Sequence, residues 1–165
     1  MSFTRDDELR RIAEGVMARS LPKSAWTHAA HVGAAVWIIA RCPELVPERD
    51  MPGLIRAYNE ASGTPNTDTG GYHETITLAS LRAASAFLAT LPAGVPLHAA
   101  CNALLDSPLG RRDWMLAHWS RERLFSPAAR RAWVEPDLAP LDLGAAHPGG
   151  SGLLPVPSRE FPRCC

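Results

Sequence analysis

Residues 25–41 read AWTHAAHVGAAVWIIAR, and this stretch decides the fold. Most of its positions are apolar, and the first charged side chain is Arg41. A helix that is apolar on nearly every side is buried among other helices. We therefore predict a central buried helix over residues 25–41, ended by Pro43, which cannot continue a helix.

Proline and glycine divide the rest of residues 1–134 into further helical segments. We expect these helices at about 5–19, 48–61, 72–90, 96–106 and 109–119, with a short one after Ser126-Pro127. No strand alternation, internal repeat or heptad pattern is visible. The pattern predicts an all-α fold, a single helical bundle of about six to seven helices over residues 1–141. Residues 142–165 are expected to form a disordered or irregular tail rich in proline and glycine.

The composition excludes several function classes. The chain has 165 residues, a net charge of zero, 46% apolar residues and 21% charged residues. These values are typical of one folded domain, and they argue against nucleic acid or a membrane as the partner. The charged, amphipathic first twenty residues are unlike a signal peptide, so we expect a cytoplasmic protein. All but one of the basic residues are arginine, which is typical of a GC-rich bacterium.

Two histidine-bearing stretches suggest a site. Trp26-Thr27-His28-Ala29-Ala30-His31 lies at the start of the central helix, and Gly71-Tyr72-His73-Glu74-Thr75 starts a later one. His28 and His31 share one helix face, because residues three apart are neighbours on a helix. In an up-and-down bundle these two helices are parallel, which places His73 at the same end.

This arrangement predicts a metal centre. His28, His31 and His73 would bind a divalent transition metal, and Zn, Fe, Mn, Ni and Cu are not distinguished by such a set. Glu74 would be a general base or a fourth ligand, with Tyr72 beside it as a further catalytic residue. Each residue also has a structural alternative: hydrogen bonding in the core for the histidines, a first-turn acid for Glu74, and a core position for Tyr72.

Residues 111–131 hold six arginines against two acidic residues. Such a segment can attract an anionic substrate or partner, and the alternative is a solvated helix surface with acidic neighbours elsewhere in the fold. We expect Arg121 and Arg123 to orient a substrate carboxylate, because arginine binds carboxylates bidentately. His118 is a further candidate for substrate binding.

Four motifs together resemble a small family of bacterial helical proteins without an established activity. They are WTHAAH at 26–31, GYHET at 71–75, WSRERLFS at 119–126 and PDLAPL at 136–141. This resemblance implies the fold and no mechanism. The bundle and its histidine count are also similar to those of DinB-like bundles, which bind metal through three histidines. The histidine placement differs, so no residue role is transferred.

The function we predict is a metal-dependent enzyme that acts on a small polar or anionic molecule at one end of the bundle. Its chemistry would be that of a hydrolase, a lyase or a non-haem oxygenase. A small-molecule binding module without metal is the first alternative, and a helical interaction protein is the second. The commonest glycine-rich nucleotide motifs, the GxSxG motif and the HExxH motif are absent. The sequence leaves the oligomeric state open.

Overall fold

The computed structural model describes residues 2–143. In that part of the chain the regular structure is all helical, which confirms the predicted class. The long helices begin and end within a few residues of the predicted positions. The α-helices are α1 (Asp6–Met17), α2 (His28–Arg41), α3 (Pro47–Ala61), α4 (Glu74–Thr90), α5 (Leu97–Asp106), α6 (Arg121–Leu124) and α7 (Pro127–Arg131), and three single-turn 3-10 helices are η1 (Lys23–Ala25), η2 (Pro108–Gly110) and η3 (Trp114–Ala117).

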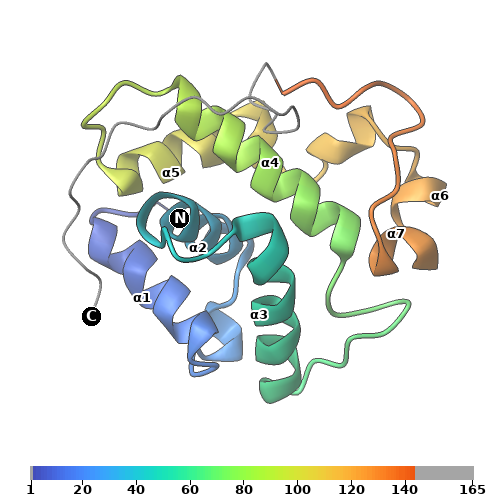
Figure 1. Ribbon diagram of the computed structural model, residues 1–165, viewed down its shortest axis with the longest axis horizontal. Coiled ribbons are helices and arrows are strands. Elements are labelled where there is room, and N and C mark those ends of the chain that lie inside the picture. The colour runs from blue at the N-terminus through green and yellow to red at the C-terminus, as the bar shows by residue number, and fades with distance from the viewer. Residues whose placement is uncertain (1, 144–165) are drawn as a thin grey trace.

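Helix α2 lies at the centre of the bundle and packs against α1, α3, α4 and α5 (Figure 1). Its buried side chains join two clusters of apolar residues, one shared with α1, α3 and α4 and the other shared with α1, α4 and α5. Gly33 permits a close approach to α1, because a Cβ at this position would lie 3.0 Å from Leu9. The central position follows from the apolar composition of this helix.

The predicted helix over 109–119 is wrong. The chain forms two short 3-10 helices there, η2 and η3, with Arg111, Arg112 and Asp113 between them. A continuous helix would need the amide of Trp114 to donate to the carbonyl of Gly110. That amide donates to the carbonyl of Arg111 at 3.5 Å, and the Gly110 carbonyl oxygen lies 2.8 Å from His28 Nε2. Gly110 is also a poor helix former.

Residues 132–143 contain no helix or strand and form a strap over α6 and η3. Asp137 accepts hydrogen bonds from the amide and hydroxyl of Ser120, each at 2.7 Å. The fully buried Trp119 donates to the carbonyl oxygen of Val134 at 3.0 Å. These contacts hold the small helices α6 and α7 against α4 at one edge of the bundle (Figure 1). Most of the predicted tail, residues 142–165, lies outside the described residues.

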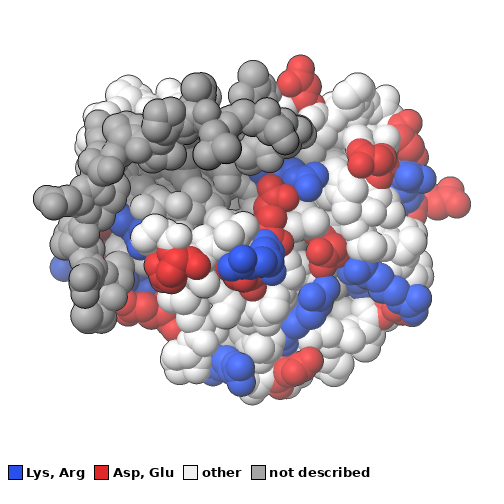
Figure 2. Space-filling view, viewed as in Figure 1, with Lys and Arg blue, Asp and Glu red and all other residues white. Residues whose placement is uncertain are grey.

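The visible face of the molecule carries acidic and basic side chains interspersed, with no area of a single sign (Figure 2). This distribution agrees with a net charge of zero. Among residues 2–143, no helix combines the length and apolar character that crossing a membrane requires.

Candidate functional site

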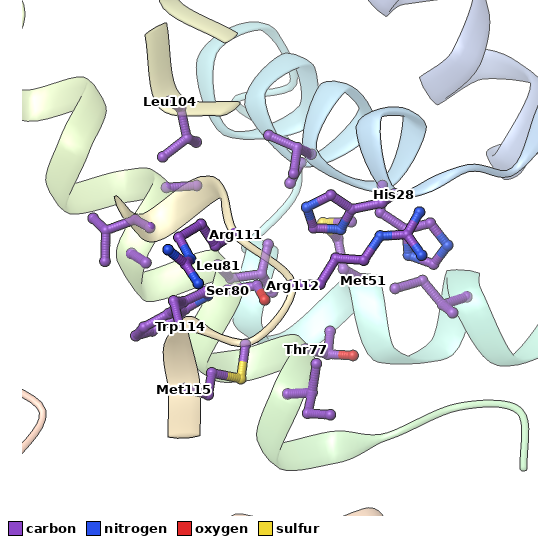
Figure 3. Close-up of a pocket in the computed structure, with 18 of the residues that line it drawn as sticks. His28, Met51, Thr77, Ser80, Leu81, Leu104, Arg111, Arg112, Trp114 and Met115 are labelled. Atoms are coloured by element: carbon purple, nitrogen blue, oxygen red, sulfur yellow. The ribbon is translucent and has the colours of Figure 1, made fainter. Parts of the chain in front are cut away.

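A cavity of about 440 Å³ lies between the first half of α2, the middle of α4 and the η2–η3 segment (Figure 3). Its volume lies within the range typical of small-molecule sites. Most of its wall is apolar, and no aspartate or glutamate lines it. The polar lining residues are Thr27, His28, His31, Thr77, Ser80, Arg111 and Arg112.

His28 connects two walls of this cavity. It is half-buried at the start of α2, and its Nε2 atom is 2.8 Å from the carbonyl oxygen of Gly110. Since a carbonyl only accepts, Nε2 carries the proton in this bond. The bond fixes the turn that precedes Arg111 and Arg112.

His31, one turn later, lines the same cavity with an exposed ring. Its ring stacks on Trp26 with 3.7 Å between centroids and 25° between planes. Neither ring nitrogen has a hydrogen-bond partner within residues 2–143, and the side chain is exposed to the cavity. Desolvation by the surrounding protein is the main cause that lowers the pKa of His31, to about 4. Repulsion from the neighbouring His28 and Arg112 adds to it. The ring is therefore neutral at pH 7.

Arg111 and Arg112 line the cavity from the loop between η2 and η3. Arg111 is paired with Asp113, with Nε and Oδ1 3.0 Å apart. Arg112 forms no salt bridge within the described chain, and it lies close enough to His31 to affect its pKa. The cavity thus has a net positive wall. The signal that the sequence analysis missed is the turn at Gly110, which places the two exposed residues after it at the edge of the cavity.

His73 lies outside this cavity and has a structural role. Its Nδ1 accepts from the amide of Ile76 at 3.3 Å and caps α4, while its Nε2 donates to the carbonyl of Leu124 at 2.9 Å. Burial lowers the pKa of His73, so the ring stays neutral. Because both nitrogens are engaged, the ring has no lone pair left for a metal.

The predicted set of His28, His31 and His73 is therefore not brought together as a metal centre. Within residues 2–143, no three histidine, cysteine, aspartate or glutamate side chains form a group that could hold a metal ion. The reason is the position of α4, which begins beside α7 and whose N-cap residue His73 binds the carbonyl of Leu124 in α6.

Glu74 and Tyr72 form a separate cluster with Arg56. Glu74 Oε2 is 2.8 Å from the guanidinium of Arg56, which also lies over the Tyr72 ring at 4.1 Å from its centroid. The Tyr72 hydroxyl is buried without a well-formed hydrogen bond in the described chain, although Thr77 and Glu74 lie near it. Burial and the nearby Glu74 raise the pKa of Tyr72. Neither Tyr72 nor Glu74 lines the cavity.

The remaining three predicted site residues contact the strap or a side chain next to it. His118 Nδ1 is 2.9 Å from the carbonyl oxygen of Pro140, and the ring lies edge-on to Trp119. Arg123 donates to the carbonyl of Glu135, and Arg121 lies over the Phe125 ring. None of His118, Arg121 and Arg123 lines the cavity.

The comparisons with known proteins give no further assignment. No family model, no curated protein and no solved structure matches this chain.

Proposed function

We propose that the protein binds a small organic anion in the cavity between α2, α4 and the η2–η3 segment. The observation that carries this proposal is the pairing of Arg112, which has no salt bridge in the described chain, with His31, whose ring nitrogens have no partner there. Both side chains are exposed where they line the cavity, so their hydrogen-bonding atoms are open to a ligand, and a few converging polar groups of this kind orient ligands in apolar pockets.

The charge of the wall favours an anion. Arg112 contributes a positive charge at this wall, and that charge helps to lower the pKa of His31. A carboxylate placed between them would pair with the guanidinium and accept a hydrogen bond from the imidazole. Since no acidic side chain lines the cavity, nothing in the wall competes for these donors.

The rest of the wall sets the shape of the ligand. Apolar side chains from α2, α3, α4, α5 and η3 enclose most of the cavity. A ligand with an apolar body and one anionic group therefore fits better than a highly charged metabolite, because apolar burial supplies affinity and the charge fixes orientation.

The experiment is a titration with a panel of small carboxylates, each compared with its neutral amide, followed by melting temperature and by NMR shifts of cavity residues. We expect the carboxylates to bind at least tenfold more tightly than the amides. Arg112→Ala removes this preference. The matched control Arg121→Ala removes the same charge outside the cavity and leaves the preference intact. Equal binding of acids and amides, or no binding of either, overturns the proposal.

Metal-dependent catalysis remains a prediction that rests on sequence. Only His28 and His31 of its three ligands line the cavity. Repeating the titration in EDTA separates the two hypotheses. Binding that survives the chelator supports the anion site, whereas binding that EDTA abolishes supports a metal and contradicts our proposal.

A further inference from the structure

We infer that the anion is an aromatic carboxylate, with a flat ring that extends the stack formed by Trp26 and His31. This inference rests on the proposed function and specifies the class of ligand. Three features of the cavity carry it: the orientation of the stack, the side chains across from it and the position of the cation.

The stack has a fixed orientation. The Trp26 ring packs on the imidazole of His31 and also meets the Tyr58 ring edge-on, with centroids 5.3 Å apart and an angle of 62°. Tyr58 is itself fixed, because it is almost fully buried and its hydroxyl donates to the carbonyl of Leu21 at 3.1 Å. Trp26 covers one face of His31, both side chains line the cavity, and His31 is exposed there. A flat neutral ring is therefore presented to the ligand in one orientation.

The other walls are suited to a ring. Met51 from α3 and Met115 from η3 are buried and line the cavity, and Trp114 lies beside Met115 (Figure 3). Thioether sulfur makes favourable contacts with aromatic edges, and aromatic side chains pack on one another in stacked or edge-on geometry. A saturated chain would fill the same volume without these contacts.

The guanidinium of Arg112 lies near the stack of Trp26 and His31 and not on the opposite wall of the cavity. Arg112 extends toward His28 in Figure 3, and its charge acts on His31. A carboxylate attached directly to a ring can therefore reach the guanidinium while the ring lies against the imidazole. A long aliphatic acid would place its chain along the apolar wall and leave the His31 face uncovered.

The test compares four probes with the wild-type protein: benzoate, 2-naphthoate, cyclohexanecarboxylate and octanoate. Benzoate and cyclohexanecarboxylate have the same charge and a similar size, so their affinity ratio isolates the ring. We expect the aromatic acids to bind about tenfold more tightly than the saturated ones. We also expect NMR signals of Trp26, His31 and the bound acid to show mutual ring-current shifts, a readout that needs no variant.

The variant His31→Gln gives the second readout. It removes the stacking face from an exposed position, so folding is retained, and we expect the aromatic preference to fall toward unity. Equal affinity for benzoate and cyclohexanecarboxylate would overturn the aromatic inference and leave the anion site standing. Tightest binding of octanoate would overturn it in favour of an aliphatic acid. No binding of any of the four acids would overturn both proposals.

Discussion

Helices α2 and α4 each carry a histidine near their N-terminus, His31 and His73, and these two histidines have opposite environments. His73 is 7% exposed, and both of its ring nitrogens are hydrogen-bonded. His31 is exposed to a cavity, and neither of its ring nitrogens has a partner within residues 2–143. A histidine near the start of a helix is a structural cap in α4 and an exposed residue of the cavity wall in α2. Hydrogen-bond saturation distinguishes them, and residue spacing does not.

The largest expected effect comes from His73→Ala. The substitution removes the cap of α4 and leaves the buried carbonyl of Leu124 without its donor, so we expect a loss of about 2 to 4 kcal/mol of folding free energy. Chemical denaturation measures it. Anion binding by the folded variant is expected to stay within a factor of two of wild type.

The control for this change is His73→Asn, which keeps a capping side chain but cannot reach Leu124. We expect about half of the loss, because asparagine is a good N-cap. If His73→Ala proved as stable as wild type but failed to bind the anion, the division between a structural and a binding histidine would be wrong.

The next largest effect is a difference in stability between substitutions at two glycines, Gly110 and Gly53. A Cβ at Gly110 would lie 2.3 Å from the carbonyl oxygen of Leu105, whereas a Cβ at Gly53 meets nothing within 4 Å. We expect Gly110→Ala to cost about 1 to 3 kcal/mol and to weaken anion binding, because the loop that carries Arg112 must move. Gly53→Ala lies in α3 and should add about 0.5 to 1 kcal/mol of stability. Thermal melts of both variants check the opposite signs, and equal signs would contradict the packing described for Gly110.

The smallest expected effect is the dependence of folding stability on pH that arises from His31. Its pKa is about 4 in the folded protein and near 6.5 when unfolded, so the unfolded chain binds more protons between these values. Stability is therefore expected to fall as the pH drops from about 6.5 toward 4. His31→Gln lacks this titration, and its stability should fall less steeply over the same range.

A bound carboxylate makes this measurement sharper. It offsets the repulsion from Arg112 and raises the pKa of His31, so the acid should bind more tightly as the pH falls from 7 to 5. Calorimetry in buffers of different ionisation enthalpy measures the proton uptake. Affinity that is independent of pH in this range would place the anion away from His31.

The long helices were predictable because their apolar periodicity and their proline boundaries are local properties of the sequence. The helix predicted over residues 109–119 was wrong because the conformation there depends on residues that are distant in the sequence. Residues 109–119 carry an acceptable helical pattern, but the chain turns at Gly110, and the Gly110 carbonyl binds His28, which is 82 residues away in the sequence. The apolar character of α2 correctly placed it at the centre of the bundle.

The candidate site was predictable in part for a similar reason. His28 and His31 are i and i+3 on one helix, and their shared wall follows from helix geometry. The placement of His73 required the relation of α4 to α6, which a bundle scheme does not contain. Arg121 and Arg123 were chosen because they follow the segment that ends at His118, and neither of them lines the cavity, whereas Arg112 does. Long-range hydrogen bonds, rather than propensities, decided each of these outcomes.

The bond between His28 and the Gly110 carbonyl also has an evolutionary consequence. The bond joins two residues that depend on each other. His28 holds the turn at position 110, and a Cβ at that position would collide with the backbone, so the turn requires glycine. A related chain that has lost His28 would be under little selection to keep Gly110, and the reverse also holds. The same is expected for Arg111 and Arg112, which follow Gly110. We expect positions 28, 110 and 112 to change together among related chains.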